Sequence, residues 1–469
     1  MAKPTPLSGF PEWLPGEQLI EQQFLDRIRR TFELHGFTPI ETRAVEPLDQ
    51  LLRKGETSKE VYLLRRLQAA ADGAAGAAGA AGAAAADGAA GAAGAADAEQ
   101  LGLHFDLTVP FARYVLENAG KLQFPFRRYQ IQKVWRGERP QEGRYREFRQ
   151  ADIDVVDRDT LAVHYDYELP IVAAEALAGL PIPAVVIHTS NRKLAQGFYQ
   201  GLGIADPPAV LRIVDKLDKI GPARVVAELV DAVGLTDAQA KACLALAEIA
   251  TDDASFADAV RRLGVDDPLL DEGLAELSAV MDAASALAPG LLKADLSIAR
   301  GLDYYTGTVY EAKMRGFEKA GTVVAGGRYD NLAESGADRF PGTGISIGVS
   351  RILGLLFGAG VLSVSRQVPA CVLVAVVAEE RRAESDAVAA ALRRRGIATE
   401  VAPAAARYGR QIRHADRRGI PYVWFPGEPG APGEVKDIRS GDQAAADPAT
   451  WEPPAEDRDP RVQGADPAG

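Results

Sequence analysis

Arginines are concentrated in one stretch of the chain, from Arg127 to Val156, where charged and apolar residues alternate. Two runs flank a Pro-Gln-Glu-Gly turn, and the charged residues of interest on them are Arg136, Glu138, Arg139, Arg144 and Arg146. The alternation predicts a β-hairpin that presents guanidinium groups on one face. A guanidinium binds phosphate oxygens in pairs and keeps its charge at neutral pH. The stretch therefore indicates a polyanion site, and the alternative interpretation is an ordinary solvated hairpin.

Two further segments place polar side chains beside the start or the edge of an element. In LHFDLTVPFARY, Asp106 and Thr108 precede an apolar helical stretch, and the structural alternative is that Thr108 caps this helix. In ARGLDYYTGTVYE, charged residues and tyrosines lie beside two glycines, namely Arg300, Asp303, Tyr304 and Tyr305. A packed structural cluster is the alternative interpretation of that group.

A third segment is rich in glycine. It combines AGGRYDNL, which begins at Ala325, with GTGISIGVSRI, which ends at Ile352. The glycines at 342, 344 and 348 allow a backbone to approach a flat ligand closely. A glycine pattern alone does not identify the ligand.

In this order and spacing, the segments resemble the histidyl-tRNA synthetase family of class II aminoacyl-tRNA synthetases, from about residue 8 to residue 450. WRGERPQEGRYREFRQADID resembles the second motif of the class and GISIGVSR its third, while RGLDYY and GGRYD resemble signatures of the histidine enzymes. The resemblance implies ATP-dependent ligation of L-histidine to its tRNA through a histidyl-adenylate, with release of AMP and pyrophosphate. It also implies Mg²⁺ accompanying ATP, a homodimer and a cytoplasmic location.

The resemblance assigns roles to individual residues. Arg136 and Arg300 would be the catalytic cations, because charge develops on phosphoryl oxygens as the histidine carboxylate attacks ATP. The residues expected to bind ATP are Arg136, Glu138, Arg144, Phe148 and Arg351. Adenine would lie between the ring of Phe148 and the guanidinium of Arg351. No separate metal cage built from protein side chains is expected.

The resemblance also implies a pocket for the amino acid. Its residues would be Asp106, Leu107, Thr108, Arg136, Gln150, Asp154, Arg300, Tyr304 and Tyr305. Asp154 would accept a hydrogen bond from a ring N–H, so that apolar isosteres leave polar groups unpaired. Arg139 and Gln141, in the hairpin turn, would meet the acceptor stem of the tRNA.

The sequence departs from the family pattern at several positions. Arg43 stands where the first motif usually has proline, which bears on the expected dimer contact. Asp106 and Asp154 stand where many members have glutamate, so each carboxylate is one methylene shorter. Ser350 replaces a frequent glutamate, and Arg149 a residue that is often aromatic or histidine.

Three other functions compete with this interpretation. A regulatory subunit of ATP phosphoribosyltransferase resembles the catalytic body but generally lacks the intact arginines and the anticodon domain, whereas this sequence has Arg136, Arg300, Arg351 and a C-terminal α/β pattern. A class II synthetase for threonine, proline or glycine is disfavoured by RGLDYY and by the pair Gln150 and Asp154. A plain nucleic-acid-binding module predicts no nucleotide turnover.

The elements that position these residues indicate an α+β chain. We expect a class II catalytic domain with an antiparallel sheet over residues 1–360, carrying an Ala/Gly-rich insertion at 71–97 and a helical insertion at about 190–290. An α/β anticodon-binding domain is expected over 368–445, and a disordered tail over 446–469. Arginine clusters at Arg393–Arg395 and Arg407–Arg418 are candidate basic patches of that second domain.

Composition restricts the class of protein. The chain has 469 residues, with 53 Lys and Arg against 65 Asp and Glu, a net charge of -12. This charge argues against binding nucleic acid through overall electrostatics but allows local patches, because salt screens a charge beyond about 10 Å. Cys243 and Cys371 lie in apolar runs, which predicts buried thiols in a reducing compartment. No apolar run approaches the ~20 residues of a membrane helix.

Overall fold

The computed structural model describes residues 4–52, 60–65, 100–299, 301, 304–428 and 431–464. The Ala/Gly-rich tract at 71–97, Arg300 and Asp303 lie outside the described residues. The chain divides into two compact units. The first comprises Met1–Pro11 and Arg27–Leu355, and the second Glu12–Asp26 and Leu356–Gly469.

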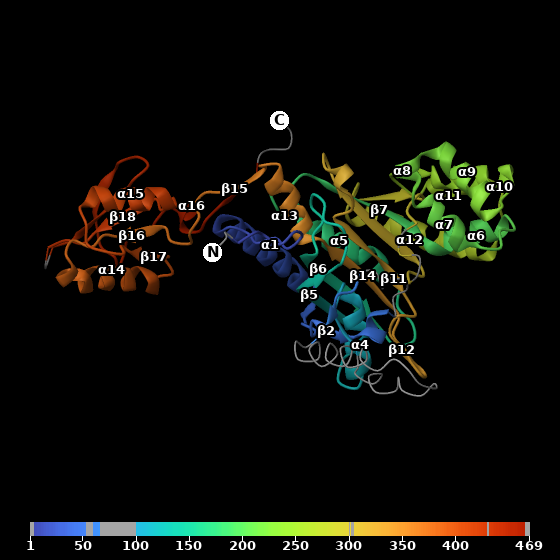
Figure 1. Ribbon diagram of the computed structural model, residues 1–469, viewed down its shortest axis with the longest axis horizontal. Coiled ribbons are helices and arrows are strands. Elements are labelled where there is room, and N and C mark those ends of the chain that lie inside the picture. Colours follow the sequence, from blue (N-terminus) through green and yellow to red (C-terminus); the bar gives the residue numbers. More distant parts are fainter. Residues whose placement is uncertain are drawn as a thin grey trace, which may run out of the picture. The chain divides into compact units, whose positions relative to one another are not determined.

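A nine-stranded sheet forms the centre of the first unit (Figure 1). Its strands lie in the order β1 (Thr38–Pro39), β5 (Phe126–Trp135), β6 (Glu147–Val156), β14 (Gly342–Ile347), β11 (Val324–Tyr329), β10 (Thr308–Met314), β7 (Val185–Asn191), β9 (Leu292–Asp295) and β8 (Ala250–Thr251). Every neighbouring pair from β5 to β7 is antiparallel, whereas β1 with β5 and β7 with β9 are parallel. The expected antiparallel sheet is confirmed.

The two faces of this sheet differ in chemistry. On β6, Ala151, Ile153 and Val155 are fully buried on one face, and α5 (His164–Ala178) packs against β6 and β14. Successive residues of a strand point to opposite faces, so Gln150, Asp152 and Asp154 share the other face. An apolar face buried under a helix thus leaves a polar face for a site.

Helices and short strands complete the first unit. They are α1 (Pro15–Leu34), α2 (Leu48–Leu51), α4 (Thr108–Asn118), α13 (Val349–Gly358), β2 (Val45–Pro47), β3 (Leu63–Leu64), β4 (Leu101–Leu103), β12 (Glu334–Ser335) and β13 (Asp338–Arg339). Part of α1 and the end of α13 belong to the second unit. Helix α1 ends just before Gly36, whose φ of 76° is a conformation that favours glycine and ends helices.

A helical module lies between β7 and β9 in the sequence, and Figure 1 shows its helices beside the β7 end of the sheet. It contains α6 (Arg192–Gly201), α7 (Pro207–Val214), α8 (Leu217–Ile220), α9 (Pro222–Val233), α10 (Asp237–Ala247), α11 (Phe256–Arg261) and α12 (Pro268–Leu287). Side chains that accept backbone N–H groups begin four of these helices: Asn191, Asp206, Thr236 and Asp267. The helical pattern read from the sequence therefore corresponds to a run of seven helices, four of which begin with a side-chain cap.

The second unit has a five-stranded sheet in the order β17 (Thr399–Val401), β16 (Val372–Val374), β18 (Tyr422–Phe425), β19 (Gly433–Asp437) and β20 (Gln443–Ala446). The first three strands are parallel to one another, and the last two are antiparallel. Its helices are α14 (Arg382–Arg394) and α15 (Tyr408–Arg418), followed by α16 (Ala455–Arg458), and β15 (Leu362–Val364) pairs with β21 (Val462–Gly464).

The chain after β20 differs from the disordered tail that we expected, because α16 and β21 occupy it up to Gly464. Asp457 is buried, accepts a hydrogen bond of 2.7 Å from Tyr422 and pairs with Arg439 at 2.6 Å. Arg366 donates to the carbonyl oxygens of Asp457 and Arg458. Long-range polar contacts order this segment. Contacts of this kind do not produce the periodic spacing of apolar residues from which order is read in a sequence.

Both cysteines are buried free thiols, as predicted. In the described part of the chain, no helix combines the length and the apolar character needed to span a membrane.

Candidate functional site

The predicted hairpin is present as β5 and β6, and backbone hydrogen bonds hold the loop between them. The N–H of Arg136 donates to the carbonyl oxygen of Arg146 at 2.8 Å, and the N–H of Arg146 donates to that of Gly9 at 2.7 Å. The N–H of Trp135 donates to the carbonyl oxygen of His104 at 3.0 Å, while the His104 ring stacks on the indole. The start of the arginine-bearing loop is thus fixed before any ligand binds.

Two pockets open on the polar face of the sheet. The first pocket is lined by all five residues expected to bind ATP, Arg136, Glu138, Arg144, Phe148 and Arg351, together with Val324 and Ala325 of β11 and the glycines 143 and 348. The second pocket is lined by Asp106, Thr108, Arg136, Gln150, Asp152, Asp154, Tyr304, Tyr305 and Tyr329, among others. Arg136, Gln150, Ala325 and Ser346 line both pockets, so the pockets are contiguous.

The cations of the first pocket are held by main-chain oxygens. Arg136 Nε donates to the carbonyl oxygen of Phe105 at 3.0 Å, and its Cζ lies 5.1 Å from the ring centroid of Phe148. Arg351 Nη1 donates to the carbonyl oxygen of Thr322 at 2.6 Å, and Nε to that of Gly143 at 3.1 Å. Fixed donors of this kind stabilise developing negative charge without reorganising.

The carboxylate of Glu138 lies between two arginines of the first pocket. Its Oε2 is 3.0 Å from Arg144 Nη1, and its Oε1 is 3.9 Å from Arg136 Nη1. The side chains of Glu138 and Arg144 are 22% and 44% exposed. An anionic ligand would therefore compete with Glu138 for both guanidiniums.

The segment before α4 supplies one wall of the second pocket. Asp106 Oδ1 accepts the N–H of Val109 at 3.1 Å, whereas Thr108 is the first residue of the helix and caps nothing. The interpretation of Thr108 as the cap is therefore wrong: Leu107 holds the N-cap position without a side-chain bond, and Asp106 is the side chain that accepts a helix N–H. Leu107 is fully buried and lines neither pocket with its side chain.

Asp154 lies at the far end of the second pocket, and both its oxygens are engaged. Oδ2 is 2.6 Å from Arg128 Nη2, and Oδ1 accepts a hydrogen bond of 2.6 Å from the hydroxyl of Tyr329. The side chains of Arg128 and Asp154 are 0% and 3% exposed. Asp154 is thus a buried, paired carboxylate at the pocket wall, and Arg128 and Tyr329 are partners that the sequence did not single out.

Asp152 is a second residue that sequence reasoning missed. It lies between Gln150 and Asp154 on the same face of β6, is 3% exposed and lines the second pocket. Burial raises the pKa of Asp152 to about 7, with Asp154 also raising it and Arg128 lowering it. The two-residue period of QADID would have found it, because residues 150, 152 and 154 must share a face.

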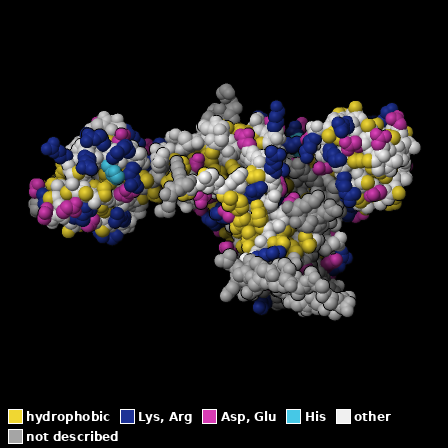
Figure 2. All heavy atoms as spheres, in the orientation of Figure 1, with side chains coloured by type: hydrophobic (Ala, Val, Ile, Leu, Met, Phe, Trp, Pro, Cys, Tyr) yellow, Lys and Arg dark blue, Asp and Glu magenta, His cyan; other side chains and the backbone are white. Residues whose placement is uncertain are grey.

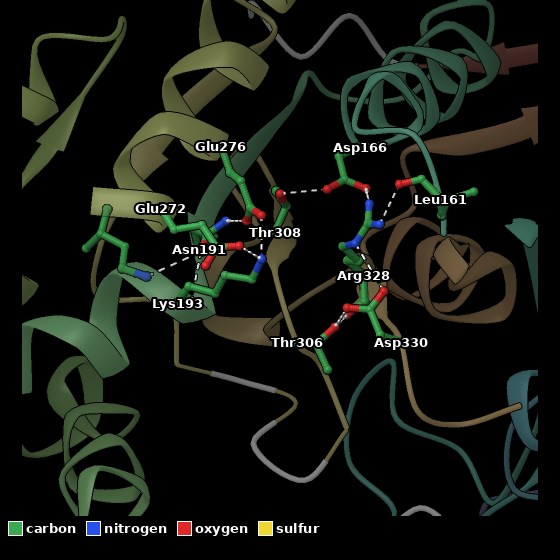
Figure 3. Close-up of polar contacts among 11 residues, drawn as sticks. Leu161, Asp166, Asn191, Lys193, Glu272, Glu276, Thr306, Thr308, Arg328 and Asp330 are labelled. Carbon is green, nitrogen blue, oxygen red and sulfur yellow. Dashed lines mark hydrogen bonds and ion pairs between the residues drawn. The ribbon is translucent and has the colours of Figure 1, made fainter. Parts of the chain in front are cut away.

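A polar network holds the chain just after the two tyrosines (Figure 3). The hydroxyl of Thr306 donates to Asp330 at 2.5 Å, and the hydroxyl of Thr308 donates to Asp166 at 3.0 Å. Arg328, from the GGRYD segment, contacts both carboxylates, at 3.2 Å to Asp330 and 3.4 Å to Asp166. The network therefore fixes the segment that carries Tyr304 and Tyr305, whose ring centroids are 4.1 Å apart.

Figure 3 shows a second group of polar contacts, beside the helical module. Thr308 pairs with Asn191 across β10 and β7, and Asn191 Nδ2 donates to Glu276 of α12 at 2.9 Å. Lys193 of α6 pairs with Glu276 and with Glu272. These contacts thus join β7 and α6 to α12, and β7 pairs with β10, the strand that carries Thr308.

The remaining predicted residues lie elsewhere. Arg139 and Gln141 are exposed on the loop between β5 and β6 and line neither pocket. The backbone of Gln141 pairs with that of Arg144 in a tight bridge. Arg300 lies outside the described residues, so its predicted catalytic role stays a prediction.

Basic side chains gather on α15 of the second unit, and Figure 2 shows Lys and Arg around a histidine on that face. Arg407, Arg410, Arg413 and Arg417 are exposed there. The other expected cluster has a structural use, because Arg393 donates to the carbonyl oxygen of Thr399 and Arg395 to those of Pro448 and Trp451. The α15 face is the basic surface that remains open.

Comparison with protein-family models gives two matches. A model described as histidyl-tRNA synthetase matches residues 92–352, and a model described as anticodon binding domain matches residues 371–443. The histidine–tRNA ligase of Cutibacterium acnes is 56% identical to the chain over 472 residues, which cover 99% of this chain and 100% of that protein.

Solved structures give a matching result. The crystal structure of histidyl-tRNA synthetase from Nostoc sp. has a TM-score of 0.81 and 33% identity, covering 95% of this chain and 97% of that one. An ATP phosphoribosyltransferase regulatory subunit/histidyl-tRNA synthetase from Bacillus halodurans has a TM-score of 0.68 at 17% identity, covering 85% and 93%. The second likeness shows a common fold alone.

Proposed function

The chain belongs to the histidyl-tRNA synthetase family, and from this premise we propose that it joins L-histidine to the tRNA specific for histidine. In the first step the histidine carboxylate attacks the α-phosphorus of ATP, which forms histidyl-adenylate and releases pyrophosphate. In the second step the histidyl group passes to the terminal ribose of the tRNA, and AMP leaves.

One observation carries this proposal. Arg136 and Gln150 line both pockets, so a ligand in one pocket meets a ligand in the other at these two side chains. With ATP in the first pocket and histidine in the second, carboxylate and α-phosphate would meet beside the Arg136 guanidinium. Holding both reactants at one cation supplies proximity and charge stabilisation together. Arg300 is proposed as the second cation on the strength of the family motif alone.

ATP would be bound by the remaining side chains of the first pocket. Phe148 and Arg351 are proposed to sandwich adenine, and Glu138 to accept from its amino group. Arg144, which is the most exposed of the set, is proposed to bind the outer phosphates. The substrate would be ATP carrying Mg²⁺, because this ion is held largely by substrate phosphates and water.

Histidine would be bound by both walls of the second pocket. Asp106 and Thr108, with the main chain at Leu107, are proposed to face the α-amino group. Gln150, Asp154, Tyr304 and Tyr305 would surround the side chain. A pocket with three carboxylates suits a substrate that carries an ammonium group and ring N–H donors.

The tRNA would contact both units. Arg139 and Gln141 are proposed to meet the acceptor stem, since both are exposed on the loop that borders the first pocket. The second unit would bind the anticodon, for which the exposed arginines of α15 offer charge. A cytoplasmic homodimer is proposed from the family pattern. In the first motif, Arg43 pairs with the buried Glu46 at 3.0 Å.

Charging of purified tRNA with labelled histidine tests the function. We expect histidyl-tRNA to form only when ATP is present, and no charging would refute the proposal. Arg139→Ala should weaken charging at limiting tRNA while leaving adenylate formation unchanged. Arg158→Ala, at an arginine on another exposed loop of the same unit, is the matched control.

A further inference from the structure

A short segment joins the end of β9 to the RGLDYY motif, and its first residue is Asp295. Ser297 and Ile298 continue it, and Ala299, which is 3% exposed, is the residue before Arg300 in the sequence. None of the residues 295–299 lines either substrate pocket. The segment therefore leads to the proposed second cation without lining the place where a substrate would bind.

Both carboxylate oxygens of Asp295 hold this segment in a turn. Oδ1 accepts from the N–H of Ser297 at 3.1 Å and from its hydroxyl at 2.6 Å. Oδ2 lies 3.0 Å from Nδ1 of His188, on β7, the strand that pairs with β9. An ionised carboxylate only accepts, so Nδ1 carries the hydrogen of this bond. One side chain thus ties the start of the segment to its own backbone and to a neighbouring strand.

The carboxylate of Asp295 is a charged acceptor. Burial alone would raise the pKa of Asp295, but the hydrogen bonds from His188 and Ser297 lower it below its ordinary value. Hydrogen bonds to an ionised acceptor are stronger than those between neutral groups. The backbone adds two bonds: the N–H of Leu296 donates to the carbonyl oxygen of Ile249 at 3.0 Å, and that of Ile298 to the carbonyl oxygen of Asp295 at 3.3 Å.

A cavity of about 100 Å³ lies on one side of this turn. His188, Asp295, Ser297 and Ile298 line it, and the rest of its lining comes from the ends of α7 and α8 and from β10. Atoms beside a cavity lack packing partners on that side. Hydrogen bonds to Asp295, more than packing, therefore fix the conformation of the turn.

We propose that Asp295 is a positioning residue for Arg300: the turn that it holds, braced by His188, sets where the chain presents this arginine to the reactants. The inference rests on the proposed function, in which Arg300 is the second cation of adenylate formation. A displacement of about 1 Å caused by a change far from the chemistry can slow a reaction about 10²-fold. The RGLDYY motif lies between this turn and the network around Arg328, so hydrogen bonds fix the chain on both sides of the motif.

Single-turnover release of pyrophosphate by Asp295→Ala tests the inference. We expect adenylate formation to slow about tenfold or more, while the histidine KM changes by less than about twofold, because no contact with a substrate is lost. Asp295→Asn should keep more of the rate, since its amide oxygen can still accept from Ser297. Asp252→Ala is the matched control and should keep the wild-type rate, because Asp252 pairs with Lys293 of β9 at 2.8 Å but is 77% exposed.

A double-mutant cycle with Arg300→Ala separates positioning from a general loss of structure. Arg300→Ala alone should slow adenylate formation about 10²-fold. When this arginine is already absent, Asp295→Ala should slow the step further by less than about twofold, because residues that act as one unit are not additive. If the two effects multiply instead, Asp295 does not act through Arg300 and the inference is overturned. An unchanged rate in Asp295→Ala would overturn it as well.

If Asp295→Ala does not fold, His188→Ala gives the same cycle, since it removes the partner of Oδ2 from a side chain that is 37% exposed. We expect a rate about threefold lower, as for one lost hydrogen bond, and no further loss beside Arg300→Ala. A wild-type rate in His188→Ala, or in Arg300→Ala itself, would overturn the inference. Absence of histidine-dependent exchange in the wild type would instead overturn the proposed function, and this inference with it.

Discussion

Arg128 Nη2 lies 2.6 Å from Asp154 Oδ2, and the two side chains are 0% and 3% exposed. The pair joins β5 to β6 directly beneath the second pocket, where the two residues are cross-strand partners. Its guanidinium also lies over the ring of Phe111, at 4.4 Å from the centroid. A carboxylate of the pocket wall therefore belongs to a charge pair that is almost wholly buried.

Removing one partner of this pair should be costly. Arg128→Met leaves Asp154 buried without its counter-charge, and we expect a loss of about 3–5 kcal/mol in the unfolding free energy of the first unit. Lys133→Ala is the control on the same strand, because Lys133 is 47% exposed and its pair with Glu147 contributes about 0–1 kcal/mol. Urea unfolding compares the two variants. Equal losses would contradict the assigned difference in burial.

Arg136 should act mainly in the transition state of activation. Arg136→Ala is expected to slow adenylate formation by about 10²-fold or more, since a preorganised cation is lost. Single-turnover release of pyrophosphate measures this step directly. Arg158→Ala serves as the control, because Arg158 lies outside both pockets. If Arg136→Ala released pyrophosphate at the wild-type rate, Arg136 would not stabilise the transition state as proposed.

Stability should depend on pH through Asp152. Its folded pKa of about 7 exceeds the ordinary 3.8, so between these values the folded state holds a proton that the unfolded state has lost. Stability therefore falls as pH rises through this window. Asp152→Asn lacks the effect, and its advantage over wild type should grow from about pH 4 to pH 7, by up to about 4 kcal/mol. Unfolding midpoints that run parallel across this range would contradict the assignment.

The network around Arg328 should position the tyrosine segment. Asp330→Ala removes the acceptor of the Thr306 hydroxyl and one partner of Arg328. We expect the histidine KM to rise about tenfold, as for the loss of one hydrogen bond to a charged group, with the ATP KM changed by less than about twofold. Arg339→Ala, at an exposed neighbour that bonds Asn331, is the control. If the ATP KM changed and the histidine KM did not, the network would not act on the tyrosine segment, and the prediction would be wrong.

Local patterns in the sequence predicted several elements closely. The helical insertion expected at about 190–290 corresponds to the helices α6 to α12, from Arg192 to Leu287. The alternation between Arg127 and Val156 predicted β5 and β6. Strand alternation depends on neighbours two residues apart, so it is visible without any knowledge of tertiary contacts.

Features that depend on distant partners could not be predicted in this way. Arg128 looked like one more arginine of the hairpin until Asp154 was found opposite it. Leu107 was grouped with Asp106 and Thr108, yet its side chain turns into the core because a helix begins there. The segment that holds Asp457 is ordered by Arg366 and Arg439, which are remote from it in sequence. Such pairings are set by tertiary packing.

The central claim is that the contiguous pockets bind ATP and histidine side by side. Amino-acid-dependent ATP–pyrophosphate exchange on the purified chain tests it most directly, with each of the common amino acids supplied in turn. We predict exchange with histidine and at most trace exchange with the others. No exchange with histidine, or equal exchange with threonine, proline or glycine, would contradict the account.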